Sequence, residues 1–201
     1  MTLAGSIGMK PPQNMKPPRK ALFIGRFQPF HKGHERLLRY LSHRYARVVI
    51  TIGSSQEKRT ENNPFSAQER RKVIKKVVAG FPARLRAKVS FAALPDQATN
   101  SAWVCRLYAR WPPAEFAIAS ANPLVRRLLQ KAGYALDASP LFRRREWEGA
   151  KIRTRIRRKE EASARLPPAI GAWMDQKGKQ IVLRSSGARR GGGKAGRSGR
   201  T

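Results

Sequence analysis

Short apolar segments alternate along the middle of the chain with segments of helical spacing. The segments with the composition and length of buried strands are 21–25, 47–53, 88–94, 116–120 and 134–138. Those with helical spacing or helix-start signals are 35–44, 66–79, 100–110, 123–132, 150–158 and 168–174. Strands that alternate with helices of about ten residues are typical of βαβ units. The pattern therefore predicts an α/β fold, with a Rossmann-like parallel sheet flanked by helices and C-terminal helices after it.

The two ends of the chain lack this pattern. Residues 1–20 repeat Met-Lys-Pro-Pro at 9–12 and 15–18 and show no hydrophobic periodicity, which predicts a flexible basic leader. Residues 185–201 are mainly glycine, serine and arginine, a composition typical of disorder. We therefore expect one folded domain over 21–184, between a flexible leader and a disordered Arg/Gly tail.

The formal net charge is +31 at pH 7 for 201 residues. The leader carries +4 and the tail +5, which leaves +22 on residues 21–184. Such a field attracts polyanions, namely nucleotides, nucleic acids or anionic membranes, without selecting among them.

Composition excludes other classes of protein. A single cysteine, Cys105, rules out an internal disulfide and a cysteine-rich metal site. No apolar run approaches the roughly 20 residues that a membrane-spanning helix needs. Residues 3–9 are short and glycine-broken, with no basic residue before them, unlike a signal peptide. We therefore expect a soluble, cytoplasmic protein that does not enter a membrane.

The segment after the first predicted strand carries the most informative pattern, because ligands bind at the carboxyl ends of strands in parallel α/β sheets. It contains His31-x-Gly33-His34 at a predicted helix start. Histidines three residues apart point to the same side of a helix, and Gly33 lets a ligand approach the backbone. The helix N-terminus favours an anion, and Arg26 adds a permanent positive charge. These residues predict a cradle for a triphosphate, although His-x-Gly-His alone is also typical of capping or surface histidines.

The full string Gly25-Arg26-Phe27-Gln28-Pro29-Phe30-His31-Lys32-Gly33-His34 resembles the signature of the HxGH nucleotidyltransferase superfamily. It is most similar to the archaeal-type nicotinamide-nucleotide adenylyltransferase branch. Further segments resemble later blocks of that branch in the same order: Gly53-Ser54-Ser55-Gln56, Thr60, Asn63-Pro64-Phe65 and Glu69-Arg70; Pro95-Asp96, Asn100 and Trp103; Asn122-Pro123-Leu124-Val125-Arg126-Arg127-Leu128 and Gly133-Tyr134; Pro140-Leu141-Phe142, Arg143 and Gly149-x-x-Ile152-Arg153. The resemblance covers about residues 21–172 and implies a nucleotidyltransferase domain at 21–184. It implies in-line transfer of the adenylyl group of ATP to nicotinamide mononucleotide, which yields NAD and pyrophosphate.

The resemblance also implies roles for individual residues. The implied catalytic residues are His31, His34 and Arg153. The implied ATP-binding residues are Gly25, Arg26, Phe27, His31, Gly33, His34, Asn122, Arg127 and Arg153. The implied nicotinamide-nucleotide-binding residues are Gln28, Asp96, Asn100 and Trp103. Considered by themselves these residues leave alternatives open: Asn100 as a helix cap, Trp103 as a core residue and Asn122 as the start of a turn.

Two further expectations concern cofactor and assembly. The resemblance implies Mg²⁺ bound with ATP, held largely by phosphates and water, and the sequence offers no carboxylate cage for it. We therefore expect no metal site built by the protein alone. The resemblance also implies a homo-oligomer.

The last block departs from the family pattern Ser-Gly-Thr-x-Ile/Val-Arg. It contains Glu148 and Ala150, so the two expected hydroxyls are missing while Arg153 is kept. Glu148 adds negative charge near the polyphosphate if it points inward. We hypothesise that Lys151 or neighbouring arginines compensate.

Two alternative functions remain open at this stage. One is an enzyme of the same superfamily with another acceptor, such as FMN, phosphopantetheine or an alcohol phosphate, against which the block Asp96, Asn100 and Trp103 favours nicotinamide mononucleotide. A basic nucleic-acid-binding protein is supported by the net charge and the Arg/Gly tail, although no zinc-finger spacing, RNP-like strand or helix-turn-helix signal is present. Nucleic-acid contact through the basic tails is compatible with either enzyme.

Overall fold

The computed structural model describes residues 18–139, 142 and 146–187. The predicted leader up to residue 17, the tail from residue 188 and three residues of the last family block, Pro140, Leu141 and Arg143, lie outside the described residues. The strands are β1 (Lys20–Gly25), β2 (Arg47–Gly53), β3 (Val89–Leu94) and β4 (Phe116–Ala119). They form one parallel sheet in the order β3-β2-β1-β4. The predicted α/β class with a parallel sheet is confirmed.

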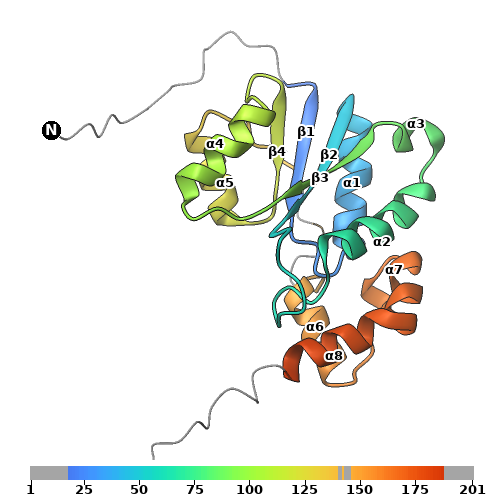
Figure 1. The fold of residues 1–201 in the computed structure, drawn as a ribbon. Coiled ribbons are helices and arrows are strands. Elements are labelled where there is room, and N and C mark those ends of the chain that lie inside the picture. Colours follow the sequence, from blue (N-terminus) through green and yellow to red (C-terminus); the bar gives the residue numbers. More distant parts are fainter. Residues whose placement is uncertain (1–17, 140–141, 143–145, 188–201) are drawn as a thin grey trace, which may run out of the picture.

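Helices cover both faces of this sheet and one end of it (Figure 1). The helices before the last connection are α1 (Lys32–Arg44), α2 (Ala67–Ala79), α3 (Ala83–Arg86), α4 (Asn100–Arg110) and α5 (Pro123–Lys131). Those after it are α6 (Gly149–Arg157), the 3₁₀ turn η1 (Ser163–Arg165), α7 (Pro168–Trp173), the π-helical turn η2 (Met174–Gly178) and α8 (Lys179–Gly187). Figure 1 shows α4 and α5 on one face, α1 to α3 on the other, and α6 to α8 beside the carboxyl ends of the strands.

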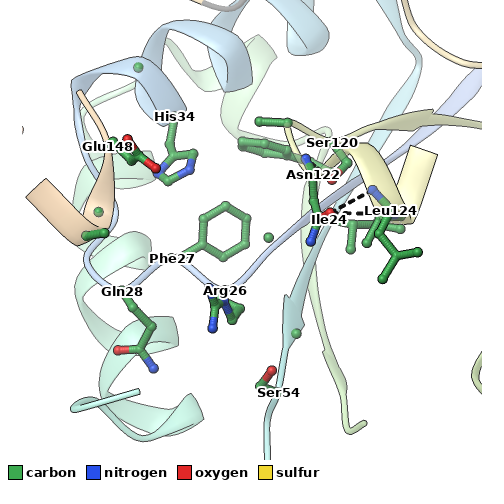
Figure 2. A pocket seen from close by; sticks show the side chains of 18 of the residues that line it. Ile24, Arg26, Phe27, Gln28, His34, Ser54, Ser120, Asn122, Leu124 and Glu148 are labelled. Carbon is green, nitrogen blue, oxygen red and sulfur yellow. Dashed lines mark hydrogen bonds between the residues drawn. The ribbon is translucent and has the colours of Figure 1, made fainter. Parts of the chain in front are cut away.

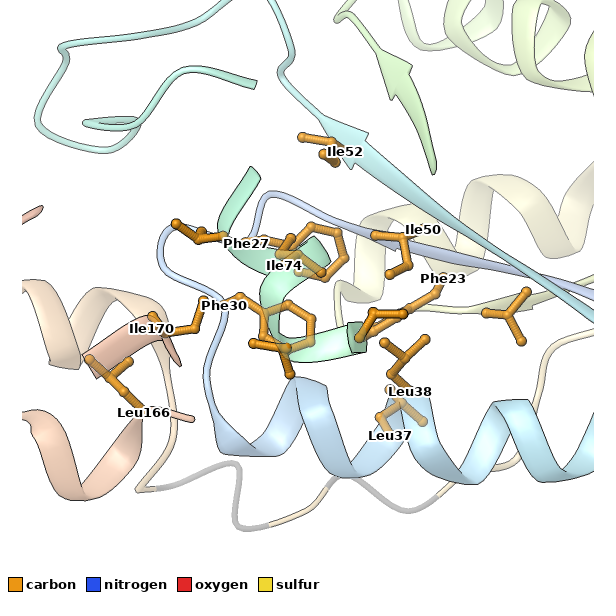
Figure 3. Close-up of a cluster of buried hydrophobic side chains, with 14 of the residues drawn as sticks. Phe23, Phe27, Phe30, Leu37, Leu38, Ile50, Ile52, Ile74, Leu166 and Ile170 are labelled. Atoms are coloured by element: carbon orange, nitrogen blue, oxygen red, sulfur yellow. The ribbon is translucent and has the colours of Figure 1, made fainter. Parts of the chain in front are cut away.

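Alternating side chains of the strands enter two separate cores. On β1, Phe23 belongs to the core that contains α1 and α2, whereas Leu22 and Ile24 belong to the core beside α4 and α5. Successive side chains of a strand point to opposite faces, so a strand covered on both faces is apolar throughout. The first core continues to the C-terminal helices through Leu166 and Ile170, as Figure 3 shows. The C-terminal helices are therefore part of the domain that forms the site.

The predicted fifth strand at 134–138 is wrong in extent. Only Leu136 forms a parallel bridge, to Ile118. The next residue, Asp137, has a buried carboxylate that accepts hydrogen bonds from the Tyr45 hydroxyl at 2.6 Å and from the backbone N–H of Ser139 at 2.8 Å. These bonds hold the chain toward α1 and not along β4, so the ladder ends after one bridge.

Helix ends also differ from prediction at three places. Thr99 caps α4, because its hydroxyl accepts from the Ala102 N–H at 3.1 Å, whereas Asn100 or Ser101 was expected. Helix α2 ends at Ala79 with Gly80 as its C-cap, and Pro82 precedes the short α3, which was not predicted. The last helix extends to Gly187, so Ser185, predicted as the start of the tail, is a buried helical residue. None of the helices described here has the length and apolar character that crossing a membrane requires.

Candidate active site

A cavity of about 550 Å³ lies where the strands end, between the sheet and the N-terminus of α6. Segments that follow all four strands line it, together with Phe142 and residues 147–150. Every site residue predicted from the sequence lines this cavity except Arg127. Figure 2 shows His34 and Glu148 on one side, Asn122 and Leu124 on the other, and Arg26 between them. The structure thus brings together side chains up to about 130 residues apart in the sequence.

His31 and His34 cap the first turn of α1 reciprocally. The backbone N–H of His34 donates to Nδ1 of His31, and the N–H of His31 donates to Nδ1 of His34, each at 3.3 Å. The rings are stacked with centroids 3.6 Å apart. Because Nδ1 accepts in both rings, the neutral imidazoles carry their proton on Nε2. Each histidine is therefore a helix cap and keeps an Nε2–H donor for a ligand, so the capping and ligand-binding alternatives are compatible.

An apolar environment keeps both imidazoles neutral. Burial lowers the pKa of His31 to about 4. Burial, and to a smaller extent the charge of His31, lower the pKa of His34 well below its usual value. The His34 ring lies among Phe23, Phe27 and Phe30, with ring centroids 5.9, 5.0 and 5.4 Å away. In the free protein at pH 7 these side chains are hydrogen-bond donors without net charge.

Close packing explains two glycines of the predicted string. A Cβ atom on Gly25 would lie 2.9 Å from the ring of Phe27. A Cβ atom on Gly33 would lie 3.2 Å from the ring of His31 and 3.2 Å from the carbonyl oxygen of Phe142. Phe27 itself is buried, has a positive φ of 53° and packs edge-on against His34. Both glycines and Phe27 thus hold the histidine pair in place while they line the cavity.

Arg153 reaches the cavity from the second turn of α6. Its Nη1 donates to the carbonyl oxygen of Gln28 at 2.7 Å and its Nη2 to Oδ1 of Asn62 at 3.4 Å. The buried Nε has no hydrogen-bond partner among the described residues. Burial, followed by the charges of Arg157 and Arg26, lowers its pKa to about 10, so the guanidinium stays charged at pH 7. A buried charge that forms no ion pair with a carboxylate among the described residues is suited to an anionic ligand.

A second buried arginine, Arg70 of α2, binds the backbone at the carboxyl ends of β1 and β2. Nη1 donates to the carbonyl oxygens of Arg26 and Gly53, each at 2.8 Å, and Nη2 to that of Ser54 at 3.1 Å. The Nε of Arg70 donates to the carbonyl oxygen of Ser66 at 3.2 Å. Its pKa is lowered to about 10, mainly by burial. Sequence reasoning identified Arg70 only as part of a family block and missed this positioning role, which no local pattern signals.

Three of the four predicted nicotinamide-nucleotide-binding residues, Asp96, Asn100 and Trp103, line the cavity from the segment between the end of β3 and the first turns of α4. Gln56 donates from Nε2 to the carboxylate of Asp96 at 3.0 Å and accepts from the Asp96 N–H at 3.0 Å, so it orients that carboxylate. Asn100 is exposed in the first turn of α4, and Thr99 takes the capping role that would have accounted for Asn100. Trp103, one turn later, is half-buried against the second core.

Two other predicted residues have structural partners. Asn122 caps α5, because its Oδ1 accepts from the N–H of Leu124 at 2.9 Å, which leaves its amide nitrogen for a ligand. The Gln28 side chain forms two hydrogen bonds with the backbone of Phe65, at 2.8 and 3.0 Å. Arg127 lines a neighbouring cleft on α5 instead of the main cavity. The ligand contacts assigned to these three residues stay predictions.

The departure from the family pattern is located at the N-terminus of α6. Glu148 occupies the N-cap position but makes no side-chain cap hydrogen bond. Its carboxylate is about half exposed and lies 3.8 Å from Nζ of Lys151. Gly149 packs closely on the carbonyl of Gln28, where a Cβ atom would lie at 3.0 Å. The pairing of Glu148 with Lys151 is the contact that the compensation hypothesis requires.

Several residues that line the cavity were not predicted as site residues. They are Ser54, Gln97, Thr99, Ser120, Leu124, Phe142 and Trp147. Ser54 and Phe142 belong to quoted family blocks, and Ser120 ends a predicted strand, so their positions were available as signals. Trp147 belongs to none of the quoted family blocks; in the structure the guanidinium of Arg36 of α1 lies 4.7 Å from the centre of its ring.

Comparison with known proteins agrees with this geometry. Residues 22–89 match the cytidylyltransferase-like family model. The chain is 36% identical over 160 residues to the nicotinamide-nucleotide adenylyltransferase of Methanolobus tindarius, with 79% of this chain and 88% of that protein covered. It is 41% identical over 134 residues to the enzyme of the same name from Ignicoccus hospitalis, with 67% and 77% covered. A bifunctional NMN adenylyltransferase/ADP ribose pyrophosphatase from Francisella tularensis has the same fold, with a TM-score of 0.67 at 20% identity, over 85% of this chain and 54% of that one.

A parallel α/β sheet with a paired-histidine cradle at its carboxyl edge defines a nucleotidyltransferase of the cytidylyltransferase-like class. Within that class, the chain belongs to the nicotinamide-nucleotide adenylyltransferase family. The resemblance stated from the sequence is confirmed.

Proposed function

We propose that this protein transfers the adenylyl group of ATP to the phosphate of nicotinamide mononucleotide, which yields NAD and pyrophosphate. The observation that carries the proposal is the convergence of His31, His34, Arg26 and Arg153 on one cavity that also contains Trp103 and Asp96. The names of the relatives support the choice of acceptor.

The composition of the site fits a transfer between two anions. The attacking phosphate is already ionised, so the reaction needs no general base and no covalent nucleophile. The enzyme lowers the barrier by holding the two substrates in line and by stabilising charge on the leaving pyrophosphate. The Nε2–H groups of His31 and His34 and the guanidinium groups of Arg26 and Arg153 are donors for these oxygens. Polyphosphate binding would also raise the pKa of the histidines, because it brings negative charge next to neutral rings.

The part of the cavity that is lined by Asp96, Asn100 and Trp103 suits the nicotinamide half. We assign the aromatic face of Trp103 to the cationic pyridinium ring, since such a ring is attracted to the face of an indole. We assign Asp96, oriented by Gln56, and the exposed Asn100 to polar groups of the same nucleotide.

Mg²⁺ is proposed to reach the site with ATP. The described residues contain no group of three or more histidine, cysteine or acidic side chains that could hold a metal ion. The residues present therefore fit an ion held by phosphate oxygens and water, with the protein donors on the remaining oxygens. When bound, the ion would neutralise charge on the polyphosphate. A homo-oligomer and a cytoplasmic location stay predictions.

The direct test is NAD formation by the purified protein from ATP, Mg²⁺ and nicotinamide mononucleotide. His34→Ala should lower kcat by roughly 10²- to 10³-fold, the typical effect of removing one donor to transition-state charge. His43→Ala is the matched control, because His43 is exposed and lies outside the cavity. Equal rates for the two variants would contradict the mechanism. More product with FMN or phosphopantetheine than with nicotinamide mononucleotide would contradict the acceptor.

A further inference from the structure

The outward side of α2 carries positive charge that no acid balances within the described part of the chain. Arg71, Lys72, Lys75 and Lys76 are all exposed, and none has a carboxylate within 4.0 Å among the described residues. The only acid of α2, Glu69, is bound to Arg59 at 2.7 Å. This face is therefore a concentrated source of positive potential outside the cavity.

Some other helical segments of the protein pair opposite charges, although α4 (Arg106 and Arg110) and α5 (Arg127 and Lys131) also place like charges four residues apart. In α1, Glu35 pairs with Arg39 at 3.2 Å, and Asp175 pairs with Lys179 at 2.7 Å, both at a spacing of four residues. At that spacing α2 places Arg71 next to Lys75 and Lys72 next to Lys76. Like charges at this spacing destabilise a helix, so these pairs do not themselves stabilise α2.

The helix dipole explains only part of this charge. Lys76 lies in the last turn of α2, and Arg86 of α3 donates from Nη1 to the carbonyl oxygen of Ala79 at 3.2 Å, where cations are favourable. Arg71 and Lys72 lie in the N-terminal half of α2, where the dipole does not favour a cation. The Arg86 contact joins α3, which also carries the exposed Arg84, to the C-terminal end of α2.

An aromatic ring borders the charge. Phe91 lies half-buried on β3, which is an edge strand of the sheet. The guanidinium carbon of Arg71 lies 6.0 Å from the centre of the Phe91 ring. A row of cations beside an accessible aromatic ring and an arginine matches how proteins bind unpaired bases, with phosphates on the cations and bases stacked on the planar groups.

We propose that this surface binds single-stranded nucleic acid, separately from the cavity. We call it the α2 surface and define it as Arg71, Lys72, Lys75, Lys76, Arg84, Arg86 and Phe91. None of these residues lines the cavity. Membrane docking is the weaker alternative, because an interfacial helix also needs large apolar anchors. The exposed large hydrophobic residues described are Tyr108, Leu124 and Leu183, which lie on other helices.

The test uses the full chain and a labelled single-stranded RNA of about 16 nucleotides, with affinity measured over a range of salt concentrations. The variant Arg71→Gln/Lys72→Gln/Lys75→Gln should bind about ten-fold more weakly or worse. Its slope of log affinity against log salt should be smaller by about 2, since each phosphate contact on a single strand contributes about 0.7. A matched variant, Arg106→Gln/Arg110→Gln/Lys131→Gln, removes the same charge from exposed positions on α4 and α5 and should bind nearly as the parent does. Both should keep NAD formation, which shows that they fold.

Two further measurements distinguish base stacking from charge contacts, and binding at the α2 surface from binding in the cavity. Phe91→Leu should weaken RNA binding without a change in the salt slope, because it removes stacking but no charge. Saturating ATP with Mg²⁺ should leave the RNA bound. Equal loss in both triple variants, displacement by ATP, or binding of phosphatidylserine vesicles in place of RNA would each overturn the proposal. These outcomes do not depend on whether the acceptor of the adenylyl group has been identified correctly.

Discussion

Arg153 and Gln28, which are 125 residues apart in the sequence, are joined by a hydrogen bond of 2.7 Å from Nη1 of the arginine to the backbone carbonyl oxygen of the glutamine. The bond connects α6 to the loop that carries the histidine pair. It holds α6 against that loop, and Arg153 also lines the cavity. The same residue therefore positions the site and supplies charge to it.

Arg153→Met should reduce kcat/KM for NAD formation by about 10²-fold or more, because it removes a charged donor and the link to Gln28 together. Arg153→Lys should recover part of this loss, since it restores the charge but not the two-sided contact. Arg158→Met, an exposed change one helical turn away, is the control and should keep the parent rate. Equal rates for Arg153→Met and Arg158→Met would remove Arg153 from the mechanism.

Stability should fall as the pH falls from about 6.5 toward 4, because the buried His31 has a pKa of about 4 in the folded protein and takes up a proton first in the unfolded chain. Its contribution is fully present above the unfolded pKa. Between pH 6.5 and 5.5 this histidine should lower the free energy of unfolding by about 1 kcal/mol, and His34, whose pKa burial also lowers well below its usual value, should lower it by a similar amount. Urea unfolding at the two pH values measures the change.

His31→Asn is the matched variant for this experiment. Asparagine is a good N-cap residue and does not titrate. The variant should lose less stability than the parent over the same pH interval, by about the His31 contribution. An identical pH dependence in both proteins would mean that His31 is not the group responsible.

Arg70→Met should lower the free energy of unfolding by roughly 2–4 kcal/mol, because the buried guanidinium donates to four backbone carbonyl oxygens that would lose their partner. The neighbouring exposed residue provides the control: Arg71→Met should change stability by about 0.5 kcal/mol or less. Urea unfolding of the two variants at pH 7 gives the comparison. Similar midpoints would show that the carbonyls find other partners.

Glu148→Ser/Ala150→Thr should change kcat/KM by no more than about ten-fold, the worth of one ordinary hydrogen bond, if Lys151 already compensates for the missing hydroxyls. Lys151→Gln should then lower activity more in the natural background than in the Ser/Thr background. The four proteins form a double-mutant cycle that measures this coupling. A rise of several orders of magnitude in the Ser/Thr variant would show that compensation is absent.

Removal of residues 188–201 should leave NAD formation and the unfolding midpoint unchanged. Removal from Ser185 onward should cost roughly 1 kcal/mol or more, because Ser185 is buried and its hydroxyl donates to Ile181, while Ser186 accepts from Arg157 at 2.7 Å. Thermal unfolding of the two truncated proteins distinguishes them. Equal midpoints would place the end of the folded domain at residue 184, as the sequence alone predicted.

The sequence by itself determined the elements and the location of the site. Four of the predicted strands formed with nearly the predicted bounds, and α2 begins beside its predicted start at residue 66, with a Ser66–Glu69 capping box. These features depend on local periodicity and on hydrogen bonds within one turn, which neighbouring residues encode. The rule that ligands bind at the carboxyl ends of parallel strands then directed attention to the edge where the cavity lies.

Only the tertiary structure decided which polar groups are used for support and which remain for ligands. The amide of Gln28 is bound to Phe65, Arg70 is bound to carbonyl groups, and Arg127 lies outside the main cavity. The buried Asp137 likewise limited a predicted strand to one bridge. The physical reason is that burial and long-range hydrogen bonds belong to the assembled chain, where a polar group must find a partner among residues far away in the sequence. The histidine pattern was visible in the sequence, but its neutral Nε2–H donors follow from the packing around it.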